Sequence, residues 1–300
     1  MRDLTPERRA LIILSHLTEP GDYAAGHLAN AVGPVEAVDM LVREKVAIPS
    51  QEHAELVRRT KPRFQPTIVD DVLRLCERSD VDILTRDDAE WPTEQFAPMG
   101  DQAPFVLYVR GNAWALAMER QNRVAIVGAR AATSYGEHVT GELVAGLVKD
   151  HVIVSGAAYG IDGAAHRMAV AAGGSTVAFL AGGVDRPYPA GHANLIERIA
   201  DSGAVVSEVP PGSAPTKWRF LQRNRLIAAL GDASIVVEAG YRSGSLNEAG
   251  HARAFGRPIG AVPGPITSAA SAGCHRLIRE GATLITDSAD IRALTTGENA

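Results

Sequence analysis

Short apolar runs recur along most of the chain and are separated by longer segments with a helical pattern. Each run is rich in β-branched and aliphatic residues and most end at glycine, serine or another small residue, which is typical of buried strands in a parallel sheet. Strands that alternate with helices predict an α/β protein with a doubly wound, mostly parallel sheet. The expected strands lie within residues 82–85, 105–112, 124–127, 152–154, 176–183, 204–208, 234–239, 258–264 and 282–287.

The first 70 residues have a different, all-helical pattern. Thr5-Pro6 places a capping residue before a proline at the first helical position, and Pro20-Gly21 breaks the chain into short helices. The sequence K-P-R-F-Q-P at 61–66 indicates a linker because two prolines flank it. We therefore expect two domains, a small helical domain over 1–70 and a sheet domain over 71–300.

Composition limits the classes of partner. The net charge is −5, so no overall basic field favours nucleic acid, and any such site has to be a local cluster. Cys76 and Cys274 are too few for a disulfide framework and suit a reducing cytoplasm. The apolar run from Ala10 to Leu17 is too short to span a bilayer. We expect a cytoplasmic protein without a membrane partner.

Three strand-to-helix turns carry small and polar residues: G-A-R-A-A-T after 124–127, Ser155-Gly156, and Ser243-Gly244-Ser245. The carboxyl edge of a parallel sheet is where such folds bind ligands, and helix N-termini favour phosphate. The first turn lacks the G-x-G-x-x-G fingerprint and the Walker lysine, which disfavours NAD and ATP. Arg130 in this turn either grips a phosphate or pairs with a structural carboxylate, and the turn alone does not decide between them.

The helix after the first turn has a predicted cap. Ser134 and Glu137 have the S-x-x-E spacing of a capping box, so we expect Ser134 to accept from a free backbone N–H at the helix start.

The segment 210–230 combines basic and aromatic residues. A proline-rich loop precedes a helix in which Trp218 and Phe220 alternate with basic side chains, an arrangement that suits single-stranded nucleic acid because cations follow phosphates and rings stack on bases. The alternative is that both rings are core residues and the cations are solvated. The basic side chains are Lys217, Arg219, Arg223 and Arg225.

Several ordered motifs together carry a family resemblance. In this order and spacing the chain resembles the DNA-processing protein A (DprA, also called Smf) family, over roughly residues 80–290 and more weakly in the helical N-terminal part, which is similar to a sterile-alpha-motif-like (SAM-like) domain. The motifs are V-A-I-V-G-A-R, S-G-A-A-Y-G-I-D-G-A-A-H, Y-P-A-G-H, S-E-V-P-P-G, F-L-Q-R-N-R-L-I-A-A-L, R-S-G-S-L and V-P-G-P.

The resemblance implies an extended Rossmann-like fold and a function. Such a protein binds and protects incoming single-stranded DNA (ssDNA) and loads the RecA recombinase onto it during natural transformation and homologous recombination. SSB is a further partner, displaced from the strand. No enzymatic activity, cofactor or metal is implied.

Site residues follow from the matched motifs, residue by residue. The family's arginine turn falls on Arg130, and its dimer contact falls in the C-terminal part, with Ile278 and Leu284 as apolar contacts that core burial explains equally well. With the two other turns and the basic segment, the expected DNA-binding residues are Arg130, Ser155, Gly156, Tyr159, Lys217, Arg219, Arg223, Asn224, Arg225, Ser243 and Gly244.

The chain departs from the family pattern in two places. Tyr159 stands where the family usually has an arginine, which removes one phosphate contact and adds a ring able to stack on a base. Many members carry a C-terminal winged helix, and we expect none here because the last apolar helix ends near Leu294.

A hydrolase is the rival class. The turn E-A-G-Y-R-S-G-S-L-N-E at 238–248 loosely resembles the acidic motif of nucleoside-monophosphate phosphoribohydrolases, which stabilise an oxocarbenium-like state with a carboxylate. Asp162 and His166 are four residues apart and fit a helix cap and its support better than a catalytic pair, and Ser155 has no His/Asp partners in sequence. A third reading is a small-nucleotide sensor that uses the same phosphate turns.

Overall fold

A nine-stranded sheet forms the centre of the protein, and its strand order is β1-β2-β6-β5-β4-β3-β7-β8-β9. The structure, a computed structural model, describes residues 3–43, 51–117 and 122–297; the expected domains 1–70 and 71–300 both include short segments outside these ranges. β1 and β2 are antiparallel at one edge, and all other neighbours from β6 to β9 are parallel. The mostly parallel sheet expected from the apolar runs is thus confirmed.

The strands coincide with the expected apolar runs but are shorter than several of them, because the run continues into the turn that follows. The strands are Asp82–Leu84 (β1), Leu107–Gly111 (β2), Asn122–Val127 (β3), His151–Ser155 (β4), Thr176–Phe179 (β5), Ala204–Ser207 (β6), Ala233–Val236 (β7), Ile259–Ala261 (β8) and Thr283–Leu284 (β9).

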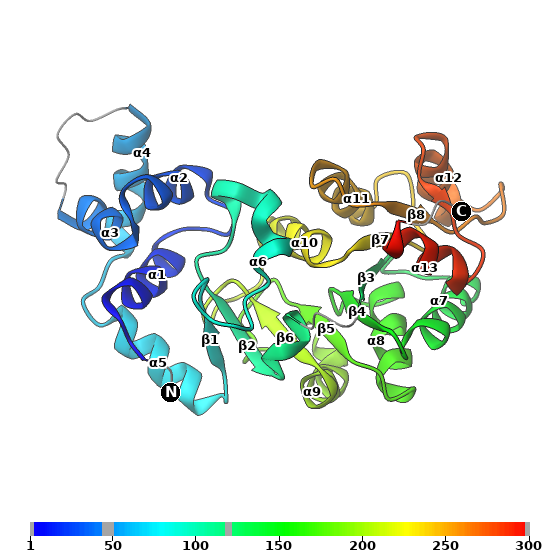
Figure 1. Cartoon of the computed structure of the whole chain (residues 1–300), viewed down its shortest axis with the longest axis horizontal. Helices are drawn as coiled ribbons and strands as arrows, with labels where there is room; N and C mark the ends of the chain where they lie inside the picture. The colour runs from blue at the N-terminus through cyan, green and yellow to red at the C-terminus, as the bar shows by residue number, and fades with distance from the viewer. Residues whose placement is uncertain (1–2, 44–50, 118–121, 298–300) are drawn as a thin grey trace.

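Helices cover both faces of the sheet, which explains why the central strands read as continuous apolar runs. On one face, α7, α8 and α13 pack on Ile126 and Ile153, and α9 packs farther along; α10, α11 and α12 cover the other face with Val127 and Val154 (Figure 1). The helices are Thr93–Phe96 (α6), Ser134–Leu147 (α7), Ile161–Ala171 (α8), Ala193–Ser202 (α9), Lys217–Leu230 (α10), Gly244–Ala254 (α11), Ala272–Arg279 (α12) and Ser288–Thr296 (α13).

The N-terminal helices form a group beside the antiparallel edge (Figure 1). Thr5 caps α1 by accepting from the Arg8 N–H at 3.2 Å, as its sequence predicted. α1 and α5 share a buried cluster with β2, and the Ser15 hydroxyl lies 3.0 Å from the Tyr108 hydroxyl. α5 crosses the expected boundary at residue 70. The helices are Pro6–Leu17 (α1), Tyr23–Val32 (α2), Pro34–Arg43 (α3), Gln51–Thr60 (α4) and Ile68–Arg78 (α5).

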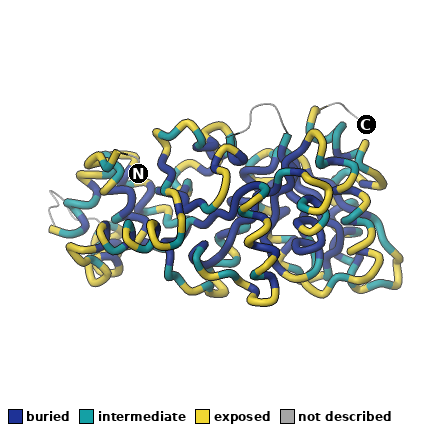
Figure 2. Tube along the Cα trace, turned by 90° about the horizontal axis from the view of Figure 1, so that it is seen from below, coloured by how far each residue is buried: buried dark blue, intermediate teal, exposed yellow. Residues whose placement is uncertain are grey.

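Buried residues of the N-terminal helices and of the sheet form one continuous cluster (Figure 2). The sheet has one topological switch point: from β3 the chain builds outward through β4, β5 and β6, and then returns to the other side of β3 to add β7, β8 and β9. The carboxyl ends of β3 and β7 therefore diverge into separate turns, which leaves the crevice where open α/β sheets bind ligands.

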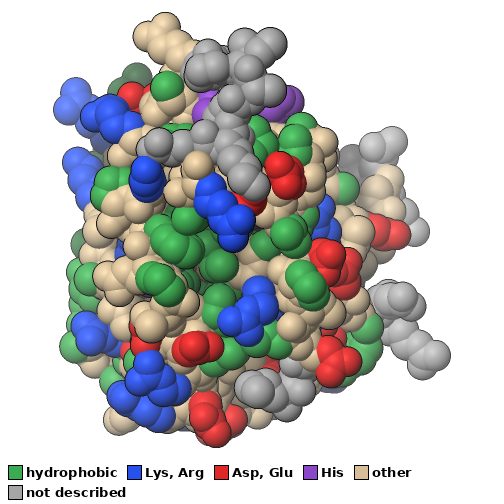
Figure 3. Space-filling view, turned by 90° about the vertical axis from the view of Figure 1, so that its left-hand side faces the viewer, with side chains coloured by type: hydrophobic (Ala, Val, Ile, Leu, Met, Phe, Trp, Pro, Cys, Tyr) green, Lys and Arg blue, Asp and Glu red, His purple; other side chains and the backbone are tan. Residues whose placement is uncertain are grey.

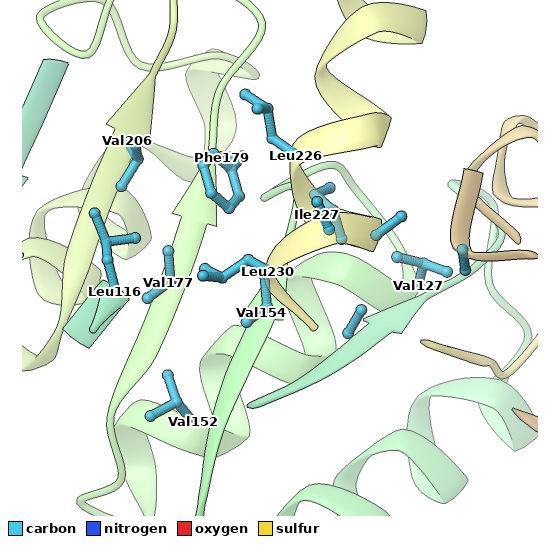
Figure 4. Close-up of a cluster of buried hydrophobic side chains, with 14 of the residues drawn as sticks. Leu116, Val127, Val152, Val154, Val177, Phe179, Val206, Leu226, Ile227 and Leu230 are labelled. Carbon is cyan, nitrogen blue, oxygen red and sulfur yellow. The ribbon is translucent and has the colours of Figure 1, made fainter. Parts of the chain in front are cut away.

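α10 lies over this crevice. Its C-terminal half is anchored in the core, where Leu226, Ile227 and Leu230 pack on strand residues such as Phe179 (Figure 4). Its N-terminal half extends beyond that cluster, with Trp218 55% exposed.

Candidate functional site

A cavity of about 380 Å³ opens at the switch point, between the β3 turn, α8, α10 and the start of α11. Volumes of this size suit a small ligand or one nucleotide of a larger one. Its lining residues are Val127, Gly128, Ala129, Arg130, Ala158, Asp162, Phe220, Leu221, Arg223, Asn224, Ile227, Gly240, Arg242, Ser243, Gly244, Ser245 and Glu248.

Arg130 and Phe220 meet at this cavity. Arg130 is exposed, and its guanidinium carbon lies 4.8 Å from the centre of the Phe220 ring, within the range of a cation–π contact. The exposed Tyr188 ring packs on the Phe220 ring, with 5.4 Å between the two ring centroids. Among the described residues Arg130 has no carboxylate within ion-pair distance, so the alternative of a structural ion pair for Arg130 finds no support here.

Arg223 is buried behind this surface. Its Nη1 donates to the Phe179 carbonyl at 2.7 Å, and the side chain lies against Gly156. A Cβ at Gly156 would lie 1.8 Å from that Nη1, so glycine at this turn makes room for an arginine. The Ser155 hydroxyl donates to the Ile126 carbonyl at 2.6 Å inside the sheet. The positions of Ser155 and Gly156 thus differ from the expectation that this turn contacts DNA.

Two buried carboxyl groups form the floor of the cavity. Burial raises the pKa of Asp162 against the pull of Arg223, and burial raises the pKa of Glu248 to about 8, only partly offset by the Ser234 hydroxyl that donates to it at 2.7 Å. Burial also lowers the pKa of Arg223 to about 10, which leaves it charged at neutral pH. Among the described residues, Glu248 Oε2 and Arg223 Nε are buried without a hydrogen-bond partner.

Glu238 occupies the N-terminus of α7. Its carboxylate accepts from the Thr133 N–H at 2.9 Å and the Thr133 hydroxyl at 2.6 Å, and it packs against Gly136. Thr133, not Ser134, is the N-cap and accepts from the Gly136 N–H at 3.1 Å, so the Ser134 capping box is wrong by one residue. An acidic side chain thus already lies at this helix start. Glu238 is one of the two glutamates of the 238–248 turn that was compared with a hydrolase motif, and it is engaged by Thr133.

The N-terminus of α11 remains open. Ser243 caps it by accepting from the Ser245 N–H at 3.3 Å, and a side chain at Gly244 would meet no atom within 4 Å. Arg242 is exposed beside it. Asn224 joins α10 to this helix through the Gly244 carbonyl at 3.3 Å and the Asn247 side chain at 3.1 Å.

The other cations of α10 have different surroundings. Lys217 is exposed at the first turn. Arg219 pairs with Glu19 of the N-terminal helices at 2.9 Å. Arg225 is 1% exposed and paired with Glu208. Burial and ion pairing separate Arg225 from solvent, contrary to the expectation that it contacts DNA, and Arg219 is paired with a carboxylate of the loop after α1.

Exposed rings extend the site outward. Tyr159 is 49% exposed, and its ring contacts the His192 ring edge-on at 4.7 Å. Trp218 and Tyr188 are also largely exposed, so the alternative that Trp218 is a core residue is wrong. Phe220, Tyr188 and Arg242 were not among the expected site residues. The R-P-Y-P loop and the alternation of rings with cations in α10 were the available sequence signals.

The expected dimer contacts differ in exposure. Ile278 is half-buried and packs against the main core, whereas Leu284 is 47% exposed on the edge strand β9. Among the described residues, no three histidine, cysteine or acidic side chains gather as a metal site would require. None of the described helices has the length and apolar character needed to cross a bilayer.

The fold and the cavity define a Rossmann-like α/β protein with a cationic, aromatic site at its topological switch point. The chain belongs to the DNA recombination-mediator protein A family, whose model matches residues 82–296. The family expected from the motifs is therefore confirmed.

The chain is similar to known relatives in sequence and in structure over most of its length. It is 48% identical to the putative DNA processing protein DprA of Mycobacterium tuberculosis, over 96% of this chain and 75% of the relative. The X-ray structure of DprA from Streptococcus pneumoniae superposes with a TM-score of 0.78 at 31% identity, covering 97% of this chain and 98% of that one. A structure describing the single-stranded DNA binding mode of DNA processing protein A from Helicobacter pylori superposes with a TM-score of 0.64 at 29% identity, over 73% of this chain and 97% of that one.

Proposed function

We propose that this protein binds ssDNA at the cavity mouth, protects it and loads the RecA recombinase onto it in natural transformation and recombination. The observation that carries the proposal is the Arg130–Phe220 contact, with Tyr188 beside it and Lys217 on the same helix. A cation and stacking rings at one place are what a strand without sequence preference requires. The Helicobacter pylori relative, with its single-stranded DNA binding mode, supports the same ligand.

Each part of the strand has a matching group. Phosphates lie against Arg130, Arg242 and Lys217 and at the α11 start formed by Ser243 and Gly244, while bases stack on exposed rings that include Tyr159. Affinity then comes largely from counterion release and falls with salt. Arg223 and Asn224 line the wall of the cavity that receives the strand. The expected DNA contacts of Arg219, Arg225 and the Ser155 turn are not part of this proposal.

The proposal includes a dimer and protein partners. A homodimer formed at the β9 edge, with Leu284 and the half-buried Ile278, holds two strand segments and gains avidity without new contacts per subunit. In this proposal RecA nucleates beside the extended strand while SSB is displaced. The protein acts in the cytoplasm. Leu284→Lys is expected to halve the mass measured by light scattering, and an unchanged mass rejects this interface.

The test is fluorescence anisotropy with labelled oligo-dT at several salt concentrations, with duplex and mononucleotide competitors. Binding that strengthens with strand length and weakens with salt supports the proposal. Arg130→Ala is expected to weaken binding about tenfold or more, whereas Arg74→Ala, which removes the same charge from an exposed ion pair within α5, leaves it unchanged. Competition by a mononucleotide at equal concentration rejects the proposal in favour of a nucleotide site.

A further inference from the structure

The N-terminal half of α10 carries Lys217 and Phe220 of the proposed DNA site, but few of its residues are buried in the core. Residues 226–230 of this helix are buried, whereas Lys217 is exposed and Leu221 is 37% exposed. Phe220 lies in this same projecting half. Its position over the cavity therefore depends on whatever holds the first two turns of α10 from the side.

Glu19, in the loop after α1, supplies that hold. Its carboxylate accepts from Arg219 Nε at 2.9 Å and Nη2 at 3.2 Å, a two-point contact of the kind that fixes orientation as well as charge. The same carboxylate accepts from Arg63 Nη1 at 3.3 Å. Burial alone would raise the pKa of Glu19, but the two arginines lower it below its ordinary value, so it stays ionised at neutral pH.

The loop continues along the same side of α10. A Cβ at Gly21 would lie 2.5 Å from Gln222 Oε1 and 2.9 Å from Arg225 Nε, and the residue has φ +71°, so the backbone packs directly on the helix where other residues would clash. Residues 219, 222 and 225 thus face the N-terminal loop. Phe220, Arg223 and Asn224 face the cavity.

α10 is therefore a wall between the N-terminal helices and the cavity. The N-terminal end of the molecule shows basic and acidic side chains interspersed with hydrophobic ones (Figure 3), which is not the single-sign surface expected of a face that binds nucleic acid by charge. The N-terminal helices can therefore affect DNA binding through α10 without contacting DNA themselves.

We propose that Glu19 is a positioning residue for the DNA site: by holding Arg219 it fixes the first turns of α10, and with them Phe220 and Lys217, over the cavity. The inference rests on the proposed ssDNA function. Arg219 acts through Glu19 and contributes no phosphate contact.

The experiment compares Glu19→Gln with Glu55→Gln in the full chain. Among the described residues, Glu55 pairs with Arg58 alone, within α4, so its variant removes the same charge and one ion pair without touching α10. We expect Glu19→Gln to raise the oligo-dT Kd about five- to tenfold and Glu55→Gln to leave it unchanged. The salt dependence of binding stays the same in both variants, since no phosphate contact is lost.

A double variant and a DNA-free readout separate positioning from general damage. If Glu19 acts only through Arg219, the double variant Glu19→Gln/Arg219→Gln binds no more weakly than Arg219→Gln alone. Amide hydrogen exchange is expected to accelerate in residues 217–222 and to stay slow in 226–230. If Glu19→Gln does not fold, Arg219→Lys, which keeps the charge but loses the two-point contact, is expected to give the same local acceleration.

Two results overturn the inference. One is unchanged DNA affinity with unchanged exchange at 217–222. The other is tighter binding with a steeper salt dependence, which would mean that Glu19 withholds Arg219 from phosphate. If the wild-type protein does not bind oligo-dT at all, the proposed function fails, and the exchange of 217–222 still decides the positioning role.

Discussion

Arg130 and Phe220 are 90 positions apart in sequence, yet the arginine guanidinium carbon lies 4.8 Å from the centre of the ring. The contact joins the turn after β3 to α10, the helix that lies over the switch point. It places a positive charge and a stacking surface at one entrance, so a phosphate and its neighbouring base can be held together.

Phe220→Ala is expected to weaken oligo-dT binding about tenfold or more, because stacking on an aromatic ring contributes roughly 1–3 kcal/mol per base. Trp114→Ala is the control, since this ring is also exposed but lies in residues 113–116, which do not line the cavity. Anisotropy measures both variants. An equal loss for Trp114→Ala would contradict a specific stacking role of Phe220.

Lys217→Ala is expected to reduce the salt dependence of binding. Lys217 is exposed at the start of α10, and each lost phosphate contact on a single strand lowers the slope of log K against log salt by about 0.7. A salt titration measures the slope. An unchanged slope with weaker binding would mean that the lysine supports the helix rather than a phosphate.

Arg225→Ala is expected to destabilise the protein, because it removes the guanidinium that pairs with the mostly buried Glu208 carboxylate. Breaking a buried ion pair costs about 3–5 kcal/mol. Urea unfolding measures the loss, and the folded fraction is expected to bind oligo-dT normally. Weaker binding with full stability would return Arg225 to the DNA site.

Glu248→Gln is expected to stabilise the protein at alkaline pH. Burial raises the pKa of Glu248 from 4.5 to about 8, so between these values the folded state keeps a proton that the unfolded state has released. Stability therefore falls as the pH rises through this window. A glutamine is neutral throughout and can still bond to Ser234.

The comparison is made by urea unfolding at pH 5 and pH 8. We expect Glu248→Gln to resemble the wild type at the lower pH and to exceed it by roughly 2–4 kcal/mol at the higher one. The neighbouring groups Asp162 and Arg223 are unchanged in both proteins. An equal difference at both pH values contradicts a proton held by Glu248.

The central strands were predictable because they are buried on both faces and so are mostly apolar. The burial and the ion-pair partners of the α10 arginines were not predictable, since they depend on segments distant in sequence. Arg219 meets a carboxylate 200 residues away, and Arg223 occupies space that the missing side chain of Gly156 leaves. No local pattern distinguishes these from Lys217, which stays exposed on the same helix.

Helix caps show the same limit on a smaller scale. Ser134 had the right spacing, but Thr133 takes the cap because Glu238 reaches its backbone and hydroxyl from the end of a distant strand. Two adjacent hydroxyl residues compete for one cap, and a tertiary contact decides between them.

Glu238 also bears on where an anion can lie in the crevice. Helix N-termini are favourable places for a phosphate, and at α7 the Glu238 side chain already occupies that place. The start of α11 is left open. Of these two helix ends, only that of α11 is free to receive an anion, so Glu238 sets the side from which an anionic ligand can enter.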